Sequence, residues 1–411
     1  MTASLTPGAL NGIKVLDLSR VLAGPWAGQM LADLGADVVK VERPEGGDDT
    51  RAWGPPWLKD GEGRDTEDAA YFCCANRNKR SIAIDIARPE GQALVRRLAL
   101  QADVLLENFK VGGLQQYGLD FHSLCPLNPR LVYCSITGFG QDGPYAQRPG
   151  YDFLIQGMGG LMSVTGPAES AQVPGEAAAD GQGPQKVGVA LVDILTGLHA
   201  VIGVLAALRH RDLTGQGQHI DLALLDVQVA ALANQTANYL IGGKVPRRMG
   251  NAHPNIVPYQ DFPTADGDMI IAVGNDAQFA RLADSLGHAD WGRDERYATN
   301  AARVANRVEL IRQMRLATLQ RSTQDWIERL ERANVPCGPI NNLEAVFADP
   351  QVLARGLRVE LPHGLGITVP GVANPIRLSA TPVQYRWAPP RLGEHGEAVL
   401  RDWLGEGSAC A

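Results

Sequence analysis

A single carboxylate, that of Asp193, lies in a run of apolar residues where a charge is costly. The run extends from Val187 to Leu208, and besides Asp193 only Thr196 and His199 in it are polar. Burying an unpaired carboxylate costs several kcal/mol or raises its pKa. The sequence therefore supports two roles for Asp193: the N-cap of a helix that begins at Ile194, or a desolvated catalytic carboxylate. The roles are compatible, because a helix N-terminus also stabilises negative charge.

The segments that must position this acid alternate between strand and helix patterns. Strands are expected at Ile13–Leu18, Ala36–Glu42, Ser81–Ile86, Asp103–Glu107 and Leu131–Ile136, with helices at Pro25–Leu34 and Pro89–Gln101. Such alternation predicts an α/β fold with a parallel sheet and helices on its faces. Ligands bind beyond the carboxyl ends of such strands. No GxGxxG motif and no P-loop motif occurs, so a dinucleotide site is weakly supported and a P-loop is excluded.

The second half of the chain has a different organisation. Residues 163–188 are rich in Gly, Ala, Pro and Gln and are expected to form a loop, and a strand at Gln218–Leu222 precedes a helix at Ala223–Leu240. A strand-like block followed by charged helices from about Asp276 to Ala333 predicts a second, smaller α+β domain. Beyond it come extended pieces and a helix near Leu392–Leu404.

Composition and charge exclude several classes of function. The 411 residues are 45% hydrophobic and 20% charged, which is typical of a globular protein of two or three domains. A net charge of −7 and a pI of 5.7 argue against binding to nucleic acid or to anionic membranes. The first fourteen residues lack a signal or transit pattern, and Asp193 favours a buried core helix over a membrane span. We therefore expect a cytoplasmic protein without a membrane partner.

The cysteines give no sign of a metal centre. The chain has six of them, at positions 73, 74, 125, 134, 337 and 410, with no CxxC pair and no His/Cys spacing suited to zinc. Free thiols in a reducing compartment are the simplest interpretation. We expect no metal site.

Long, ordered blocks of the sequence resemble the class III CoA-transferases, also called the CaiB/BaiF family. The blocks are VLDLSRVLAGPWAGQMLADLGADVVKVERPEGGDDTR, NRNKRSIAIDI, PEGQALVRRLALQADVLLENF, YCSITGFGQDGPYAQRPGYD and LVDILTGLHAVIGVLAAL. Later segments, among them GNAHPNIVPYQDF and VPCGPINNLEAVFADPQV, are most similar to the branch that moves CoA from succinyl-CoA to glutarate and related dicarboxylates. The resemblance implies a Rossmann-like large domain from residues 1–225 and 336–411, a small domain at 230–335 and an interlocked homodimer.

In this family an aspartate that opens the helix after the apolar stretch is the nucleophile, and it matches Asp193. The resemblance implies that the carboxylate attacks an acyl-CoA thioester and passes through an aspartyl anhydride and an aspartyl-CoA thioester. One thioester replaces another, so CoA thioesters and small carboxylic acids are the only partners, and no tightly bound cofactor is implied. Apolar surroundings suit this role, because water would hydrolyse both intermediates.

The resemblance also implies a CoA site. Its residues are Val21, Leu22, Ala23, Arg43, Lys79, Asn108 and Phe109. Arginine suits phosphate because its donors form a fixed fork. A solvated charge at a strand end is the alternative for Arg43 and Lys79. Gln116 stands where some relatives carry an arginine, which departs from the family pattern.

Three further positions bear on the substrate. Tyr151 stands where racemases of the family carry a histidine, and a phenol with an ordinary pKa of about 10 is a poor acid–base group at neutral pH. Arg248, next to Arg247, is a candidate cation for the second carboxylate of a dicarboxylic acid. Gly274 opens a turn, Gly274–Asp276, that could donate amides or act as a lid. A solvated basic turn and a simple turn are the respective alternatives.

Three functions follow in order of preference. The first is a CoA-transferase that uses succinyl-CoA and a dicarboxylate such as glutarate. The second is a 2-methylacyl-CoA racemase, which Tyr151 disfavours. The third is a protein that binds acyl-CoA without catalysis. The sequence does not decide among acceptors that differ by a methylene, which changes binding by only about 1–3 kcal/mol.

Overall fold

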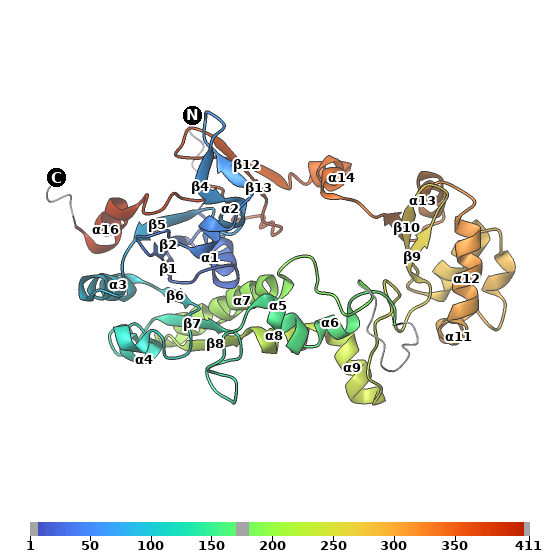
Figure 1. Ribbon diagram of the computed structural model, residues 1–411, viewed down its shortest axis with the longest axis horizontal. Coiled ribbons are helices and arrows are strands. Elements are labelled where there is room, and N and C mark those ends of the chain that lie inside the picture. Colours follow the sequence, from blue (N-terminus) through green and yellow to red (C-terminus); the bar gives the residue numbers. More distant parts are fainter. Residues whose placement is uncertain (1–6, 170–180, 407–411) are drawn as a thin grey trace. The chain divides into compact units, whose positions relative to one another are not determined.

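The computed structural model describes residues 7–169 and 181–406 (Figure 1). The chain forms two compact units. The larger unit comprises Met1–Leu161, Val187–Gly242 and Pro350–Ala411, and the smaller unit comprises Met162–Lys186 and Gly243–Asp349. Of the segment expected as a loop, residues 163–169 and 181–186 belong to the smaller unit, and residues 170–180 lie outside the described part of the chain. The smaller unit also extends past residue 335 to Asp349.

A fully parallel, six-stranded sheet forms the centre of the larger unit, in the order β5-β2-β1-β6-β7-β8. Its strands are β1 (Lys14–Asp17), β2 (Asp37–Glu42), β5 (Lys79–Ala83), β6 (Val104–Glu107), β7 (Val132–Thr137) and β8 (His219–Ala223). The predicted parallel sheet is confirmed. The strand order reverses between β1 and β6, which is where ligands bind in open α/β sheets.

Helices cover both faces of this sheet (Figure 1). One face packs on α1 (Ala23–Asp33) and α7 (Leu191–Thr214), and the other packs on α3 (Pro89–Gln101), α4 (Phe121–Leu124) and α16 (Gly396–Leu404). The sequence dictates this division because successive strand residues point to opposite faces. In β6, Val104 and Leu106 join the first core, and Leu105 joins the second.

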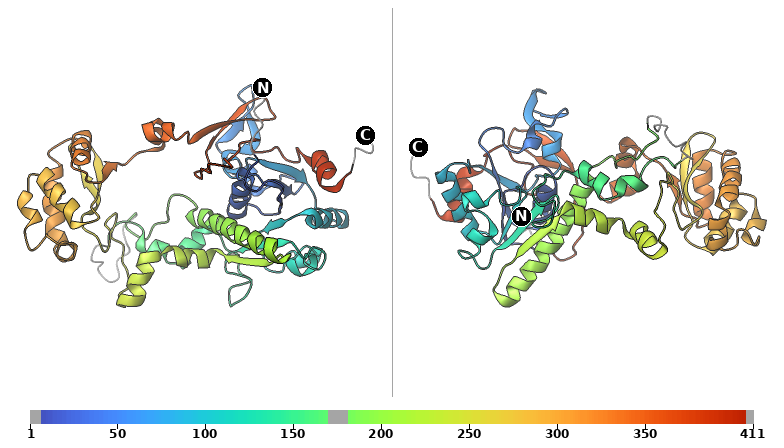
Figure 2. Two further views of the ribbon diagram at one scale, coloured as in Figure 1. Left: turned by 180° about the vertical axis from the view of Figure 1, so that it is seen from behind. Right: turned by 60° about the horizontal axis from the view of Figure 1, so that its bottom comes forward.

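Helix α7 is the longest helix of the larger unit among the described residues, and Figure 2 shows it from two further directions. Its length and apolar composition alone would allow a membrane span, as the sequence indicated. In this fold it packs against α1, β7 and β8. Its buried residues include Val192, Ala200 and Val204, which belong to the core beneath the sheet. It therefore serves as a core helix here.

Smaller elements complete the larger unit. They are the 3-10 helix η1 (Asp49–Ala52), the hairpin of β3 (Trp57–Lys59) and β4 (Asp65–Ala69), α2 (Ala70–Cys73), the 3-10 helix η2 (Gln115–Tyr117), α5 (Asp152–Met158), α8 (Leu224–Ala231), α9 (Ala233–Gly242), α15 (Pro350–Ala354) and the hairpin of β12 (Arg358–Pro362) and β13 (Thr368–Val372). The short helix α6 (Leu161–Val164) begins at the last residue of the first segment of this unit.

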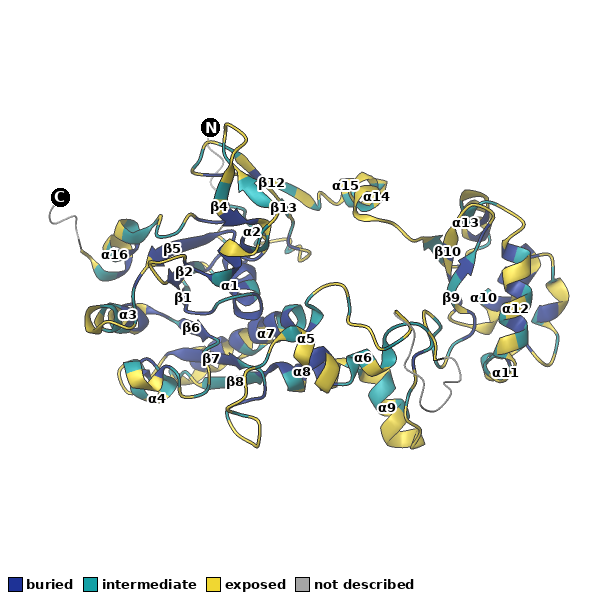
Figure 3. Cartoon of the chain, viewed as in Figure 1, coloured by how far each residue is buried: buried dark blue, intermediate teal, exposed yellow. Residues whose placement is uncertain are grey.

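The smaller unit is built from an antiparallel sheet and helices, with a core of its own (Figure 3). The sheet has the order β11-β10-β9, from β9 (Tyr259–Pro263), β10 (Asp268–Ala272) and β11 (Cys337–Pro339). Its helical elements are α10 (Asp276–Ser285), η3 (Ala289–Gly292), α11 (Asn300–Ala305), α12 (Arg307–Thr318), α13 (Thr323–Arg332) and α14 (Leu343–Ala348). The predicted α+β character of this region is confirmed.

Two sequence predictions of single elements need correction. The helix expected at Ala223–Leu240 is divided into α8 and α9, because Ala233 has a left-handed backbone with φ of 43°. Strand β5 runs from Lys79 to Ala83, and so begins before the expected Ser81. This shift matters for function, because it places Lys79 inside the sheet.

Candidate active site

Asp193 lies in the first turn of α7, not in front of it. The helix begins at Leu191 and its N-cap residue is Ala190, so the N-cap interpretation of Asp193 is wrong. The capping is done by another acid: Asp152 Oδ1, from α5, accepts the backbone N–H groups of Val192 at 2.8 Å and Asp193 at 3.4 Å. The carboxylate of Asp193 is thereby left free of a capping role.

The surroundings of Asp193 favour its neutral form. Its residue is 9% exposed, and no ion pair to it occurs within the described part of the chain. Burial, and then the negative charge of Asp152, raise the pKa of Asp193 from 3.8 to about 7. A carboxylate with a pKa near the working pH is a stronger base and nucleophile than an ordinary aspartate and is still available in ionised form.

A cavity of about 220 Å³ opens onto Asp193. It brings together seven of the residues singled out from the sequence, namely Asp193, Tyr151, Val21, Leu22, Ala23, Asn108 and Phe109. Three cations, Arg20, Lys110 and Arg148, also line it. Tyr151 is largely exposed at this cavity. The arrangement combines a desolvated carboxylate with positive charge suited to an anionic substrate.

The loop between β1 and α1 reaches this cavity in a strained conformation. Val21 has φ of 72°, a left-handed value that is a genuine outlier for a β-branched residue. The Val21 N–H donates to Asp48 Oδ1 at 3.3 Å. The Asn108 side chain accepts from Arg20 N at 2.9 Å and donates to Arg20 O at 2.7 Å. Two side chains from other loops therefore hold the strained backbone in place.

Asp48 is itself held by Lys40, and sequence reasoning found neither residue. Their buried side chains form an ion pair of 2.8 Å. Burial alone would raise the pKa of Asp48, but Lys40 and hydrogen bonds from Lys40 and Thr50 lower it to about 2. Asp48 was contained in the loop expected at the end of β2, but no local pattern distinguished it from Asp49.

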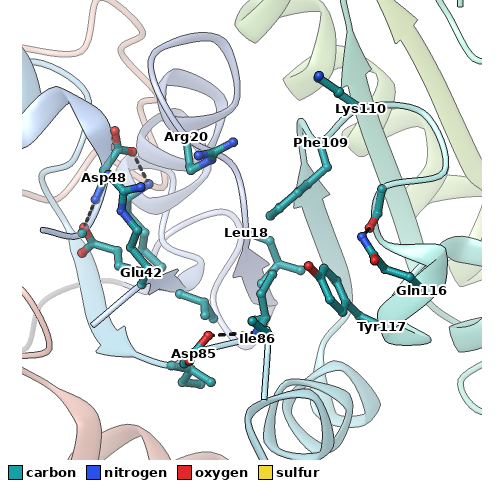
Figure 4. Close-up of a pocket in the computed structure, with 17 residues that line it drawn as sticks. Leu18, Arg20, Glu42, Asp48, Asp85, Ile86, Phe109, Lys110, Gln116 and Tyr117 are labelled. Atoms are coloured by element: carbon teal, nitrogen blue, oxygen red, sulfur yellow. Dashed lines mark hydrogen bonds and ion pairs between the residues drawn. The ribbon is translucent and has the colours of Figure 1, made fainter. Parts of the chain in front are cut away.

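A second cavity, of about 400 Å³, lies beside the first at the carboxyl edge of the sheet (Figure 4). The two share Arg20, Phe109 and Lys110. Apolar side chains line it, among them Leu18, Ile86 and Tyr117, together with Arg43. Its walls thus suit a flat, apolar ring next to phosphate groups.

Two arginines and a glutamine of this second cavity have partners already. Arg43 and Arg20 each form an ion pair with Asp49, at 2.8 Å and 3.2 Å, and their side chains are 53% and 42% exposed. Such exposed pairs are weak, so an incoming phosphate can compete for them. Gln116 lines the cavity and donates to Gly113 O at 3.2 Å.

Lys79 does not fit the role expected for it. The side chain is fully buried, and its ammonium donates to Asp17 Oδ2 at 3.0 Å, Asn76 Oδ1 at 2.8 Å and Pro25 O at 2.8 Å. All three donors are used, and none is presented to a ligand. The expectation failed because the strand begins two residues earlier than predicted. Lys79 ties β5 to β1 and to α1.

Arg248 and Gly274 belong to the smaller unit. Arg248 is 7% exposed, its Nη1 lies 3.3 Å from Glu169 Oε1, and its Nε is buried without a hydrogen-bond partner. The solvated basic turn that the sequence allowed therefore does not describe Arg248. The Gly274 N–H donates to Gln278 Oε1 at 2.7 Å, so it is not the free amide donor that we expected.

Tyr71 is a neighbour of the acid that the sequence did not reveal. It lies on α2 and makes an edge contact with Trp53, with ring centroids 5.2 Å apart. Burial, followed by the charge of Asp193, raises the pKa of Tyr71 to about 12. A phenol that stays protonated can donate a hydrogen bond to a developing oxyanion. No spacing in the sequence connects Tyr71 with Asp193, because their proximity comes from the tertiary fold.

The described part of the chain has free thiols and lacks a cluster of metal ligands. Within residues 7–169 and 181–406, no group of three or more His, Cys, Asp or Glu side chains is placed to hold a metal ion. The cysteines at positions 73, 74, 125, 134 and 337 are free thiols, and Cys410 lies outside the described residues. The expected leader-free N-terminus likewise lies partly outside them.

An all-parallel α/β sheet with a desolvated carboxylate beside two cation-lined cavities is the arrangement of an enzyme that acts on an anionic substrate. Comparison with known proteins gives the family. Residues 10–396 match the sequence model of CoA-transferase family III. The chain belongs to this family and is a class III CoA-transferase.

Similar proteins span nearly the whole chain. A succinate–glutarate CoA-transferase of Agrobacterium fabrum is 57% identical over 96% of this chain and 95% of its own length, and the human succinyl-CoA:glutarate CoA-transferase is 43% identical over 96% and 86%. Among solved structures, a CaiB/BaiF family protein from Brucella suis superposes with a TM-score of 0.82 at 52% identity, covering 97% of this chain and 100% of its own. The α/β fold with a parallel sheet and the family expected from the sequence are confirmed.

Proposed function

We propose that this protein transfers CoA from succinyl-CoA to glutarate or a closely related dicarboxylate, with Asp193 as nucleophile. The observation that carries the proposal is the carboxylate of Asp193, buried, unpaired and open to a cation-lined cavity. The substrates are those of the proteins from Agrobacterium fabrum and human that resemble the chain over nearly its whole length. Tyr151 supports transfer over racemisation, because it lines the cavity where racemases carry a histidine.

The reaction proceeds by acyl exchange at Asp193. Its carboxylate oxygen attacks the carbonyl of the succinyl thioester, and the C–S bond breaks. CoA departs as the thiolate, and an aspartyl-succinyl anhydride remains on the enzyme. The thiolate then attacks the aspartyl carbonyl, which releases succinate and forms an aspartyl-CoA thioester. Glutarate attacks that carbonyl, the C–S bond breaks, and CoA thiolate is expelled as a second anhydride, between Asp193 and glutarate, forms. The thiolate then attacks the glutaryl carbonyl of this anhydride to give glutaryl-CoA. The last step regenerates the Asp193 carboxylate, so no net proton or electron is consumed.

The larger unit supplies the chemistry of this reaction. Apolar surroundings keep water from the anhydride and make the carboxylate a better nucleophile. The N-terminus of α7 stabilises the charge that returns to Asp193 when each intermediate collapses. The negative charge of Asp193 helps to keep the phenol of Tyr71 protonated, because it raises the pKa of Tyr71 further after burial has raised it.

The two cavities at the sheet edge are proposed to hold CoA. The adenine ring would lie among Leu18, Ile86, Phe109 and Tyr117, with Arg20, Arg43 and Lys110 near its phosphates. The Val21–Ala23 segment and Asn108 would guide the pantetheine arm toward Asp193, because they line the cavity onto which it opens. Lys79 is left out of this site.

We assign the acceptor's second carboxylate to Arg248. Its guanidinium is buried and has an acidic partner, Glu169, at 3.3 Å. A dicarboxylate would replace or share that partner, and a guanidinium fork suits a carboxylate geometrically. The turn at Gly274 has open space beside it, since a Cβ added at this glycine would meet only Gln278 Oε1 within 4 Å, and we retain it as a lid segment.

The family resemblance further leads us to propose an interlocked homodimer that works in the cytoplasm without a tightly bound cofactor. Light scattering on the purified protein measures the dimer directly. A monomer that retains full activity would contradict this part of the proposal.

The deciding experiment is an exchange assay with succinyl-CoA and dicarboxylates of four to six carbons, in which mass spectrometry identifies the acyl-CoA products. We expect glutaryl-CoA from the wild type and none from Asp193→Ala, which should still bind CoA. Solvent deuterium at the α-carbon of a 2-methylacyl-CoA, with no exchange product, would instead support the racemase. CoA binding without either reaction would leave the protein as a binder of acyl-CoA.

A further inference from the structure

A polar cavity that shares Phe109 and Lys110 with the two proposed CoA cavities contains titratable groups that the proposed reaction does not use. It has a volume of about 390 Å³ and is lined by residues of β6, β7 and β8 and by α4. Glu107, Ser135 and His219 line it, one from each strand. Glu107 is 6% exposed. An acid buried this deeply needs a physical reason.

The three side chains form a row across the strands. Glu107 and Ser135 are register partners in neighbouring strands, and the Ser135 hydroxyl lowers the pKa of Glu107. Ser135 Oγ lies 2.9 Å from His219 Nε2. The His219 ring stacks on Phe121, with centroids 4.9 Å apart and an interplanar angle of 14°. Stacking fixes the ring and therefore the far end of the row.

Protonation of Glu107 reverses the direction of this row. When Glu107 is ionised, it accepts from the Ser135 hydroxyl, which in turn accepts from an Nε2–H of His219. When Glu107 is protonated, it can donate to Ser135, which then donates to an unprotonated Nε2. The serine has a single proton, so the state at one end determines the tautomer at the other.

Glu107 also holds the loop that lines the CoA cavities. Its Oε2 accepts the N–H of Phe109 at 2.8 Å. Between them, Asn108 clamps both polar groups of the Arg20 backbone. Phe109 and Arg20 each line both cavities proposed for CoA. A change in the hydrogen bond between Glu107 and Phe109 therefore acts directly on a residue that lines the proposed CoA site. Through Asn108 it also acts on Arg20, in the loop that precedes α1.

One end of the row, Glu107, can change charge near neutral pH, whereas burial favours the neutral form of His219 at the other end. Burial, only partly opposed by hydrogen bonds from Ser135 and Phe109, raises the pKa of Glu107 to about 7. Burial lowers the pKa of His219. The other titratable groups that face them are Lys110, Asp120, His122 and Tyr133 in the cavity, and Cys134 and Asp221 on the adjoining strands. An ionised Glu107 forms a charge-assisted bond to Phe109, which is about twice as strong as a neutral one.

We propose that Glu107 is a positioning residue of the CoA site, and that its ionised form, supported by Ser135 and His219, orders the Asn108–Phe109 turn for CoA binding. The inference rests on the proposed CoA site. It adds a pH-dependent element to CoA affinity that is independent of the acid Asp193.

The test compares CoA affinity of the full-length wild type and Glu107→Gln by calorimetry, with free CoA as the probe, at about pH 6 and about pH 8.5. Glutamine can accept from Phe109 and donate to Ser135, so it imitates protonated Glu107 at every pH. Taking the ratio of the two proteins cancels the titration of CoA itself. We expect similar dissociation constants at the lower pH and about three- to tenfold weaker binding by the variant at the higher pH.

A second test variant and a matched control accompany this measurement. Ser135→Ala removes a hydrogen bond that favours the ionised form, so the rise in affinity should move to higher pH. His122→Gln, a residue of the same cavity outside the row, should behave as the wild type. If Glu107→Gln does not fold, the shift in Ser135→Ala against His122→Gln decides the question.

The outcomes separate the two proposals. A ratio that is the same at both pH values, or an unshifted profile in Ser135→Ala, would overturn the role of Glu107 alone. Failure of the wild type to bind CoA at either pH would overturn the proposed CoA site, and the role of Glu107 with it.

Discussion

Buried acids of the larger unit fall into two groups that differ in their partners. In the first group, Asp17 and Asp48 are each paired with a buried lysine, Lys79 and Lys40 respectively, and the pKa of each acid is lowered. At the start of α7, Asp193 is buried with no cation, and its pKa is raised. Similar burial thus accompanies a paired, structural acid in one place and, in the other, the acid that we propose as the nucleophile. The presence of a cation partner distinguishes the two.

The largest expected effect comes from removing the unpaired acid. Asp193→Ala should lower the rate of CoA exchange by about a thousandfold or more, because the covalent route is lost. The dissociation constant for CoA should stay close to that of the wild type. Exchange kinetics and calorimetry on the same preparations measure both. Retained exchange would contradict the proposed nucleophile.

Removing the cation from a buried ion pair should instead lower the stability of the folded protein. Lys40→Met leaves Asp48 buried without its cation, and we expect a loss of about 3–5 kcal/mol in the free energy of unfolding. Urea denaturation measures this. Lys59→Met is the matched control, since its pair with Asp65 is more than half exposed and its loss should change the stability little. Equal effects of the two variants would remove the contrast between buried and surface pairs.

The unpaired acid should also lower stability as it ionises. The folded protein holds the proton of Asp193 up to about pH 7, whereas the unfolded chain releases it near 3.8, so the contribution of this group to stability falls as pH rises between these values. Asp193→Asn should therefore be about 4 kcal/mol more stable than the wild type above pH 7. Near pH 4 the difference should vanish. Denaturation curves at both pH values give the answer, and a variant less stable at the higher pH would contradict it.

The pair of Arg248 and Glu169 is an intermediate case, because its buried cation is proposed to exchange partners. Arg248→Gln should raise KM for a dicarboxylate acceptor by about tenfold, corresponding to the loss of one charge-assisted hydrogen bond. The kcat value and the KM for a monocarboxylate of equal length should change little. Steady-state kinetics with the two acceptors separate the roles. Equal losses for both would show that Arg248 is not a specificity residue.

The fold was largely predictable, and the supports of the site were not. The alternation of strand and helix patterns along the sequence predicted the parallel sheet, because each strand and each helix has a local pattern of apolar residues. Asp193 stood out because it interrupts a long apolar run. Nothing local predicted that Asp152 caps α7, or that Asp48 holds Val21, since these contacts join residues far apart in sequence. The burial of Lys79 follows from the earlier start of β5, and its ion pair with Asp17 on another strand was equally invisible to local patterns.

The construction of the larger unit from separated segments constrains the order in which it can form during synthesis. Strand β5 lies at the edge of the sheet, and the His395 N–H donates to Ser81 O, across more than three hundred residues. Trp387 O likewise accepts from the Asn78 N–H. Until these residues leave the ribosome, β5 is an uncovered edge strand, the kind of surface that pairs with other chains. Contact between the segment around Trp387–His395 and β5 is therefore expected to be a slow step in folding. Until it forms, β5 on a nascent chain is exposed to pairing with other chains.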